Sequence, residues 1–291
     1  MSSAAVHASI VVNGVRLHYA ASGDGPLCVF LHGFPEFWLA WRPQLVEFGR
    51  DHLAVAPDLR GYNRSDKPPA IADYKASVVV KDLRQLALAL GHRRFTLVGH
   101  DWGGAIAWAF AITHPGMLDR LVIVNAPHPV PFARDLASNP DQQRASSYMN
   151  LFRDPKAERV LSENGYARLA RMTVEQWNAD EDERLAYLDA WSQPGALTGM
   201  LNYYRASPLY PPVGDDPGAA RVKLAPQDFI VRVPTLVIWG MRDAALLPGL
   251  LDDLDACVPK LRIARVPDGS HWVIHEQPEH MNRLIRAFVD S

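Results

Sequence analysis

One aspartate, Asp101, stands where an apolar run meets a glycine-rich turn. Phe95–Val98 is followed by Gly99-His100-Asp101-Trp102-Gly103-Gly104, and small apolar residues come next. Glycines at 99 and 103 permit a tight strand-to-helix turn that presents the side chain at 101 to a pocket, beside a helix N-terminus. A carboxylate held in this way could attack an electrophilic carbon. The alternative is an aspartate that only caps the helix.

Two other residues could complete a catalytic group with Asp101. Asp243 lies just past the apolar run Val233–Gly240, and His271 lies in the loop that follows Leu261–Val266. In an open α/β sheet, side chains at the carboxyl ends of the strands gather at one edge. We therefore predict a triad of Asp101, Asp243 and His271, in the chain order nucleophile, acid, histidine. Asp268 is nearer to His271 in sequence, but its Pro-Asp-Gly context is typical of a turn.

The elements that must position this triad are buried strands alternating with helices. The Asn13-Gly14 pair inside Ile10–Tyr19 predicts a β-hairpin. Continuous apolar runs predict strands at Leu27–Leu31, His52–Pro57, Phe95–Val98, Leu121–Val124, Val233–Gly240 and Leu261–Val266. Helical spacing predicts helices at Trp38–Phe48, Lys75–Leu90, after the turn at Asp101 and at Pro278–Val289. This alternation indicates an α/β fold with a mostly parallel sheet, covered on both faces.

The pattern changes after Asn125, where helical stretches replace the strands. Helices are expected at Arg144–Leu151, Ala157–Glu163, Tyr166–Met172, Asp182–Trp191 and Gly199–Arg205. Leu209–Gly218 is rich in prolines and glycines and marks a boundary. We therefore predict a core domain formed by residues 1–128 and 215–291, with residues 129–214 inserted as a helical cap domain.

Composition excludes several classes of protein. The chain has 291 residues, 48% of them hydrophobic, and a net charge of −2, so nothing suggests binding to nucleic acid or to an anionic membrane surface. No segment approaches the ~20 apolar residues of a membrane span, and Met1–Ala8 lacks the features of a signal peptide. Cys28 lies in an apolar run, which favours a buried free thiol over a disulfide with Cys257. We expect a cytoplasmic protein, and the oligomeric state stays open, a homodimer included.

Three motifs carry a resemblance that covers nearly the whole chain. His32–Glu36, Gly99–Gly104 and Gly269–Trp272 resemble motifs of the α/β-hydrolase superfamily. More narrowly, the chain resembles the soluble epoxide hydrolases and the haloalkane and haloacetate dehalogenases, which share an aspartate nucleophile. The resemblance implies an α/β-hydrolase fold that needs neither a cofactor nor a metal. It also implies an oxyanion hole formed by the backbone N–H groups of Phe34 and Trp102, and a cis peptide bond between Phe34 and Pro35.

An aspartate nucleophile limits the class of substrate. A carboxylate that attacks a saturated carbon forms an alkyl ester, and water can then attack the carbonyl carbon of Asp101 itself. A serine would form an ether, which a histidine and water could not cleave. His271 would take a proton from that water while Asp243 orients the imidazole. The substrates expected are therefore small apolar electrophiles, epoxides or alkyl halides, with water as the second reactant.

The leaving group separates these two chemistries. An opened epoxide is an alkoxide and benefits from a proton donor, whereas a halide does not. In soluble epoxide hydrolases two cap tyrosines polarise the epoxide oxygen, in segments similar to Ser146–Pro155 and Met200–Arg205, and their best matches are Tyr148 and Tyr204. Tyr203 is the neighbouring candidate, but one residue of helix turns a side chain by about 100°, so only one of the two should face the pocket. The alternative is that these tyrosines are ordinary core residues of the cap.

The dehalogenases match less well. Haloacetate dehalogenases carry arginines beside the nucleophile and three positions later, where this chain has Trp102 and Ala105, and their His-Trp pair would fall near Met149-Asn150. Haloalkane dehalogenases commonly have asparagine at the position of Phe34, but they share Trp102. We predict an epoxide hydrolase that forms a vicinal diol, with a haloacetate or haloalkane dehalogenase as the alternative and a non-catalytic receptor as a third reading. The residues expected to line an apolar substrate pocket are Trp38, Met149, Leu151 and Trp272.

Overall fold

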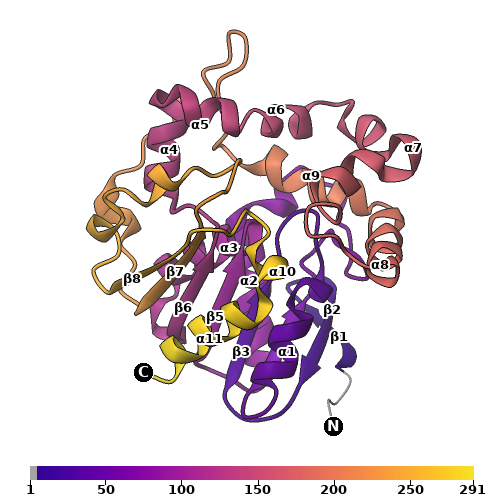
Figure 1. The fold of residues 1–291 in the computed structure, drawn as a ribbon, viewed down its shortest axis with the longest axis vertical. Helices are drawn as coiled ribbons and strands as arrows, with labels where there is room; N and C mark the ends of the chain where they lie inside the picture. The colour runs from indigo at the N-terminus through magenta and orange to yellow at the C-terminus, as the bar shows by residue number, and fades with distance from the viewer. Residues whose placement is uncertain (1–4) are drawn as a thin grey trace.

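The computed structural model describes residues 5–291 and contains one eight-stranded sheet. Met1–Ala4, which belong to the predicted core domain and to the stretch without signal-peptide features, lie outside the described residues. The strand order is β1-β2-β4-β3-β5-β6-β7-β8. β1 and β2 are antiparallel to their neighbours, and all other pairs are parallel. The mostly parallel sheet predicted from the sequence is therefore confirmed (Figure 1).

The strands lie close to their predicted positions. Asn13 (φ 47°) and Gly14 (φ 77°) form the tight turn of the first hairpin, because both can adopt a left-handed backbone. The bounds of the strands are β1 Val6–Val12, β2 Val15–Ser22, β3 Leu27–Leu31, β4 Leu53–Pro57, β5 Phe95–His100, β6 Leu118–Val124, β7 Thr235–Gly240 and β8 Leu261–Val266.

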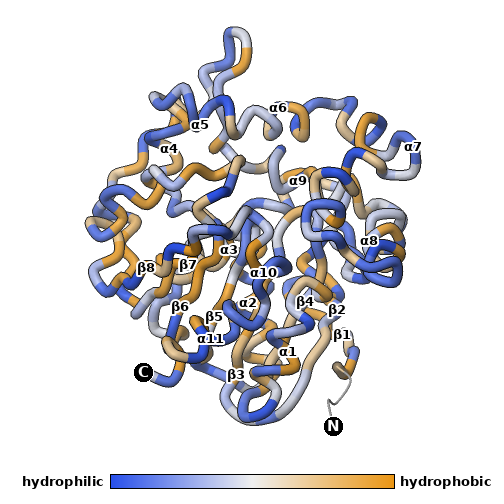
Figure 2. Tube along the Cα trace, viewed as in Figure 1, coloured by the Kyte–Doolittle hydropathy of each residue, from blue (hydrophilic) through white to orange (hydrophobic). Residues whose placement is uncertain are grey.

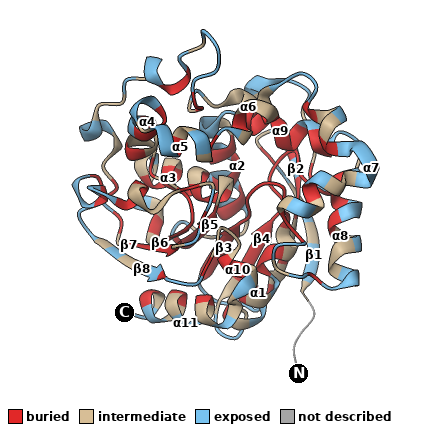
Figure 3. Cartoon of the chain, turned by 45° about the horizontal axis from the view of Figure 1, so that its top comes forward, coloured by how far each residue is buried: buried red, intermediate tan, exposed pale blue. Residues whose placement is uncertain are grey.

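Helices cover both faces of the sheet, as Figure 1 shows. α1 (Arg42–Phe48), α10 (Val273–Glu276) and α11 (Pro278–Val289) lie on one face, and α2 (Ala76–Ala89) and α3 (Trp102–Thr113) lie on the other. Alternate residues of β3 serve the two cores: Cys28 and Phe30 pack with α1 and α11, whereas Val29 and Leu31 pack with α2 and α3. The central strands β3, β5 and β7 are accordingly hydrophobic and buried along their length (Figures 2 and 3).

A helical segment, residues 129–214, lies over the edge of the sheet where β5 and β6 end (Figure 1). Its helices are α4 Pro129–Ser138, α5 Pro140–Ala145, α6 Tyr148–Arg153, α7 Ala157–Met172, α8 Glu181–Ser192 and α9 Ala196–Ala206. α7 contains both predicted helices of its region, separated by a kink at residues 163–166. Within residues 5–291, no helix combines the length and the apolar character needed to cross a membrane. Cys28 and Cys257 are both buried and free, as predicted for Cys28.

Two features of this segment differ from the prediction. The single helix expected at Arg144–Leu151 is two helices. α5 ends at Ala145, and the hydroxyl of the next residue, Ser146, accepts a hydrogen bond from the Gln142 side chain (2.8 Å). α4 was not predicted, because Pro129 and Pro131 resemble turn residues. They occupy the first turn of the helix, where no N–H is needed, and the His128 side chain caps that turn.

Candidate active site

Asp101 occupies the turn between β5 and α3 in an unusual backbone conformation. Its φ is 49° and its ψ −119°, a region that L-residues rarely adopt and that is often found at functional sites. The turn is also tightly packed. A β-carbon at Gly103 would lie 2.2 Å from the carbonyl oxygen of Leu31, and one at Gly99 would lie 2.5 Å from that of Gly103. Glycine at 99 and 103 therefore allows strand, turn and helix to approach closely enough to expose the Asp101 side chain.

The structure brings Asp101, Asp243 and His271 together. Nε2 of His271 is 3.6 Å from Oδ2 of Asp101, and Nδ1 is 2.7 Å from Oδ2 of Asp243. The side chains of Asp101 and His271 are 12% and 13% exposed, whereas that of Asp243 is fully buried. Asp268 is 81% exposed and lies near Arg242, away from the triad. One histidine thus faces two carboxylates: a buried one that it hydrogen-bonds, and an accessible one beyond hydrogen-bond distance.

Asp243 is fixed by three donors besides His271. Its Oδ1 accepts hydrogen bonds from the backbone N–H groups of Ala245 (2.8 Å) and Leu246 (2.9 Å). Its Oδ2 accepts one from the Asn125 amide (2.7 Å), whose own oxygen accepts from the N–H of Gly240 (2.9 Å). The sequence reading missed Asn125, although a polar residue directly after the buried strand β6 was the available signal. Burial raises the pKa of Asp243, but His271 and these donors outweigh it and hold the pKa below its usual value.

The same charges influence the protonation of Asp101 and His271. Burial lowers the pKa of His271, but the carboxylates of Asp243 and Asp101 outweigh burial and raise the pKa to about 9. For Asp101, burial raises the pKa, and the opposing effects of His271, His100 and two backbone N–H groups do not fully cancel it. The charged imidazole of His271 is therefore favoured by both carboxylates, most strongly by that of Asp243.

This arrangement predicts a pH-dependent stability. The pKa of His271 rises from its ordinary 6.5 to about 9 on folding, so its contribution is complete below pH 6.5 and is lost as the pH rises through 9. Between pH 6.5 and pH 9 the unfolding free energy of the wild type should fall by up to about 3 kcal/mol. That of His271→Gln should not show this fall. Urea unfolding of both proteins from pH 6 to 9.5 measures the difference. Parallel stability curves for the two proteins would contradict this assignment.

The predicted oxyanion donors lie beside Asp101. The N–H of Phe34 donates to Oδ1 of Asp101 (2.7 Å), and the N–H of Trp102 also stabilises the charged carboxylate. Phe34-Pro35 is a cis peptide bond, as the resemblance implies. A β-carbon at Gly33 would lie 2.4 Å from the β-carbon of Asp101, so only glycine lets the loop pass this close. These two N–H groups could stabilise an oxyanion formed on the Asp101 carbonyl.

Behind the loop lies a buried network that the sequence reading did not assign. Glu36 accepts hydrogen bonds from Nδ1 of His100 (2.9 Å) and Nε2 of His275 (2.6 Å). His100 in turn donates from Nε2 to the carbonyl oxygen of His271 (2.9 Å). Burial raises the pKa of Glu36, but the two histidines outweigh it and hold the pKa well below its usual value. The network connects the loop after β3 to the backbone of His271.

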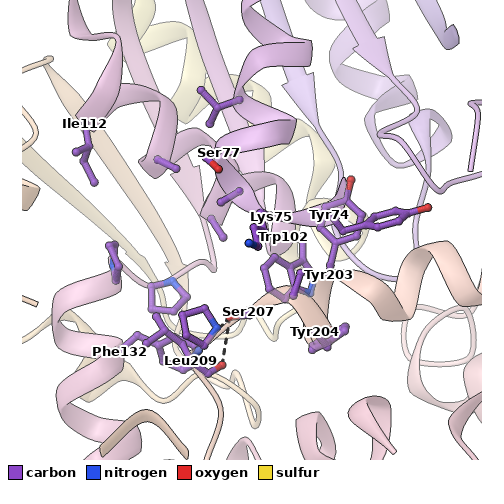
Figure 4. A pocket seen from close by; sticks show the side chains of 18 of the residues that line it. Tyr74, Lys75, Ser77, Trp102, Ile112, Phe132, Tyr203, Tyr204, Ser207 and Leu209 are labelled. Atoms are coloured by element: carbon purple, nitrogen blue, oxygen red, sulfur yellow. Dashed lines mark hydrogen bonds between the residues drawn. The ribbon is translucent and has the colours of Figure 1, made fainter. Parts of the chain in front are cut away.

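Asp101 opens into a cavity of about 1240 Å³, shown in part in Figure 4. Trp102, Tyr148, Met149 and Tyr204 line it beside Asp101, and its apolar wall continues along α3 and α4 past Ile112 and Phe132. The cavity is larger than the 300–1,000 Å³ that small-molecule sites commonly have. It therefore has room for an extended apolar ligand.

Tyr148 and Tyr204 line the cavity together with Asp101, and their rings meet edge-on. Their ring centroids are 6.3 Å apart, and the ring of Tyr204 packs edge-on against Trp102 (5.1 Å). Desolvation raises the pKa of both phenols well above the ordinary value, and the charge of Asp101 adds to this effect. Both hydroxyls therefore stay protonated and can donate. Tyr203 also contributes to the wall of the cavity, but its hydroxyl donates to the carbonyl oxygen of Arg60 (3.0 Å).

The other predicted lining residues are less well placed. Met149 lines the cavity, but Trp38, Leu151 and Trp272 are not among its lining residues in the described part of the chain. The prediction for Trp38 is not supported, because its ring packs against His7 near the first hairpin (4.7 Å). The ring of Trp272 lies between His271 (4.9 Å) and Trp177 (5.3 Å).

Comparison with known proteins gives a consistent result. The profile of the α/β hydrolase fold family matches residues 26–278. Epoxide hydrolase 3 of Xenopus tropicalis is 38% identical over 289 residues, which cover 95% of this chain and 75% of that protein. The AB hydrolase superfamily protein YfhM of Bacillus subtilis (strain 168) is 38% identical over 288 residues, covering 96% of each.

Solved structures agree over almost the whole chain. The crystal structure of a Bacillus megaterium epoxide hydrolase in complex with an inhibitor superposes with a TM-score of 0.91 at 35% identity, covering 98% of this chain and 100% of the other. An epoxide hydrolase from metagenomes of hot environments gives a TM-score of 0.87 at 38% identity, covering 98% of each chain.

Proposed function

The chain belongs to the α/β-hydrolase fold family and within it to the epoxide hydrolases, and from this premise we propose that it converts apolar epoxides to vicinal diols through a covalent ester on Asp101. The observation that carries the proposal is one cavity lined by a carboxylate and two protonated phenols. A carboxylate supplies the nucleophile for a saturated carbon, and a phenol supplies the proton that an alkoxide needs. Residues 129–214, which carry both tyrosines, are proposed to act as a cap domain.

In the first step, an oxygen of Asp101 attacks one carbon of the epoxide. The carbon–oxygen bond breaks, and the resulting alkoxide takes a proton from Tyr148 or Tyr204. Esterification removes the negative charge of Asp101, which is one of the charges that raise the pKa of His271. His271 can then release its proton to the tyrosinate through solvent and become a neutral base.

In the second step, neutral His271 takes a proton from water, and the hydroxide attacks the carbonyl carbon of the ester. The N–H groups of Phe34 and Trp102 stabilise the oxyanion. The intermediate collapses, the ester bond breaks, and the departing diol oxygen takes the remaining proton of the attacking water. Asp101 is again a carboxylate and His271 an imidazolium, held by Asp243, so charges and protons balance over the cycle.

The origin of the diol oxygen tests the covalent step. With enzyme in excess over a terminal aryl or alkyl epoxide in H₂¹⁸O, the diol from a single turnover should contain no ¹⁸O, because its new oxygen comes from Asp101. Enzyme recovered from that reaction should transfer ¹⁸O to the diol in a second turnover in ordinary water. Mass spectrometry measures both. Label in the diol of the first turnover would mean that water attacks the epoxide directly.

A substrate panel tests the choice of leaving group. Diol should form from aryl and alkyl epoxides, whereas haloalkanes and haloacids should release little halide. The absence of arginine at Trp102 and Ala105 leaves no bidentate clamp for a haloacid carboxylate at those positions. Halide release without diol formation from any epoxide would support a dehalogenase instead.

A further inference from the structure

Arg153 joins the two helices that carry the tyrosines. It is the last residue of α6, which begins at Tyr148. Its guanidinium donates to the carbonyl oxygen of Tyr204, in α9, and to that of Ser207, just past the end of that helix (3.0 Å). The guanidinium also lies 3.7 Å above the centre of the Tyr210 ring. The Arg153 side chain, on α6, thus holds the backbone of Tyr204, on α9.

The physical chemistry favours a cation at this place. The last carbonyl groups of a helix have no partners within it and carry a partial negative charge, which a cation stabilises. Only a guanidinium offers several N–H donors in a planar fork together with a flat face that can stack on a ring. Burial lowers the pKa of Arg153, while Tyr210 and Asp216 oppose this effect. The charge is therefore held in a fixed, partly dehydrated environment.

Other side-chain contacts of the two helices do not reach the Tyr204 carbonyl. Arg205 pairs with Glu158 (2.6 and 2.7 Å), which attaches α9 to α7. It also donates to the carbonyl oxygen of Asp154 (3.3 Å), just past the end of α6, but this contact lies beyond Arg153 and leaves the peptide of Tyr204 untouched. Phe152 packs against Tyr148 (5.3 Å) and Tyr204 (5.0 Å), but ring packing tolerates sliding. α6 has only six residues, and so short a helix derives little stability from its own hydrogen bonds.

We propose that Arg153 is a positioning residue that sets the distance between the hydroxyls of Tyr148 and Tyr204 above Asp101. This inference rests on the proposed function, because Arg153 acts through the tyrosines and touches no reacting atom. It predicts that Arg153 affects the alkylation step, in which the alkoxide is protonated. Hydrolysis of the ester depends on His271 and Asp243, which lie in the sheet domain, and should be affected little.

The test measures the two steps separately in Arg153 variants. Arg153→Met keeps much of the side-chain length but removes all donors, and Arg153→Lys keeps the charge without the fork. Arg159→Met is the matched control, because the Arg159 side chain lies on α7, is 68% exposed and, among residues 5–291, forms an ion pair only with Glu163. Rapid quenching and mass spectrometry give the rates at which the ester forms and disappears. Each substitution is also combined with Tyr204→Phe in a double variant. Thermal unfolding confirms that all variants are folded.

Arg153→Met should slow alkylation about tenfold and Arg153→Lys less, since small displacements of catalytic groups have effects of this size. Ester hydrolysis should change less than about twofold, and Arg159→Met should leave both rates unchanged. In the Tyr204→Phe background the loss caused by Arg153→Met should shrink to about threefold or less, because residues that act through one another are not additive. Hydrogen exchange in residues 200–206 should rise in Arg153→Met. If Arg153→Met does not fold, the same rates are compared for Arg153→Lys with and without Tyr204→Phe.

Two kinetic results would overturn the inference. In the first, Arg153→Met slows alkylation by the same factor in the wild type and in Tyr204→Phe. In the second, Arg153→Met slows alkylation and ester hydrolysis by the same factor. Either result would mean that Arg153 only stabilises the fold. If Tyr204→Phe alkylates as fast as the wild type, Tyr204 does not donate a proton in this step. Arg153 then has no tyrosine to position. Failure of the proposed function itself looks different, because the wild type would then form no diol from any epoxide.

Discussion

Replacing Asp101 with alanine is expected to abolish diol formation, with a fall in kcat/KM of at least about 10⁴-fold, the size of effect seen when an enzyme loses its nucleophile. The alanine variant keeps Tyr148, Tyr204 and the N–H groups of the loop, so it can still bind and polarise an epoxide. It cannot form the ester, because no other carboxylate described in the structure is accessible at this end of the cavity. Steady-state assays with an aryl epoxide measure the loss.

Asp268→Ala is the control for this change. Asp268 lies three residues before His271, but it is exposed and packs near Arg242. Its loss should leave kcat/KM within about twofold of the wild type, as expected for a surface substitution away from structural features. Activity lost in Asp268→Ala and kept in Asp101→Ala would reverse the assignment of roles.

Stability distinguishes loss of chemistry from loss of folding in Asp101→Ala. Burial raises the pKa of Asp101, which means that the folded protein disfavours the ionised carboxylate. Removing this carboxylate should therefore leave the Tm at neutral pH unchanged or raise it. A strongly lowered Tm would indicate that inactivity arises from misfolding, and the kinetic result would then say nothing about the nucleophile.

The triad could be predicted from the sequence because each of its members depends on local signals. Asp101 directly follows β5, and Asp243 and His271 lie in the loops that follow β7 and β8; apolar runs identify these three strands. Parallel pairing of β5, β6, β7 and β8 then brings the strand ends together without further information. Asn125, after β6, obeys the same rule, but its partner Asp243 is 118 residues away. The sequence therefore signals a polar residue at this edge of the sheet, but only the structure shows that it holds Asp243.

The walls of the cavity could not be predicted in the same way, because they depend on how separate helices pack. The helical period allows either Tyr203 or Tyr204 to face Asp101. The choice depends on a hydrogen bond from Tyr203 to the backbone of Arg60, 143 residues earlier. Trp38 is a similar case, since its type suits a pocket but its ring packs against His7 of the first hairpin. Such contacts leave no local signal in the sequence.

Replacing both Tyr148 and Tyr204 with phenylalanine is expected to nearly stop alkylation, by about 10³-fold, within the range that general acids contribute. Each single change should cost less, because the other phenol can still donate to the alkoxide. Phenylalanine preserves the rings that pack against Phe152 and Trp102, so the cavity should keep its shape. Ester formation measured by rapid quenching reports the step, and Tyr203→Phe is the control, since its hydroxyl is bound to the Arg60 carbonyl.

The size of the loss should depend on the basicity of the leaving oxygen. Ring opening of an epoxide that releases a strongly basic alkoxide needs the proton most, whereas one that releases a weakly basic, electron-poor alkoxide needs it less. Along a series of substituted epoxides, the ratio of wild-type to double-variant alkylation rates should therefore fall as the alkoxide becomes less basic. A ratio that stays constant along the series would mean that the tyrosines contribute by shaping the cavity. A double variant that alkylates at the wild-type rate would exclude them from the chemistry altogether, and would reopen the choice between an epoxide and a halide as the leaving group.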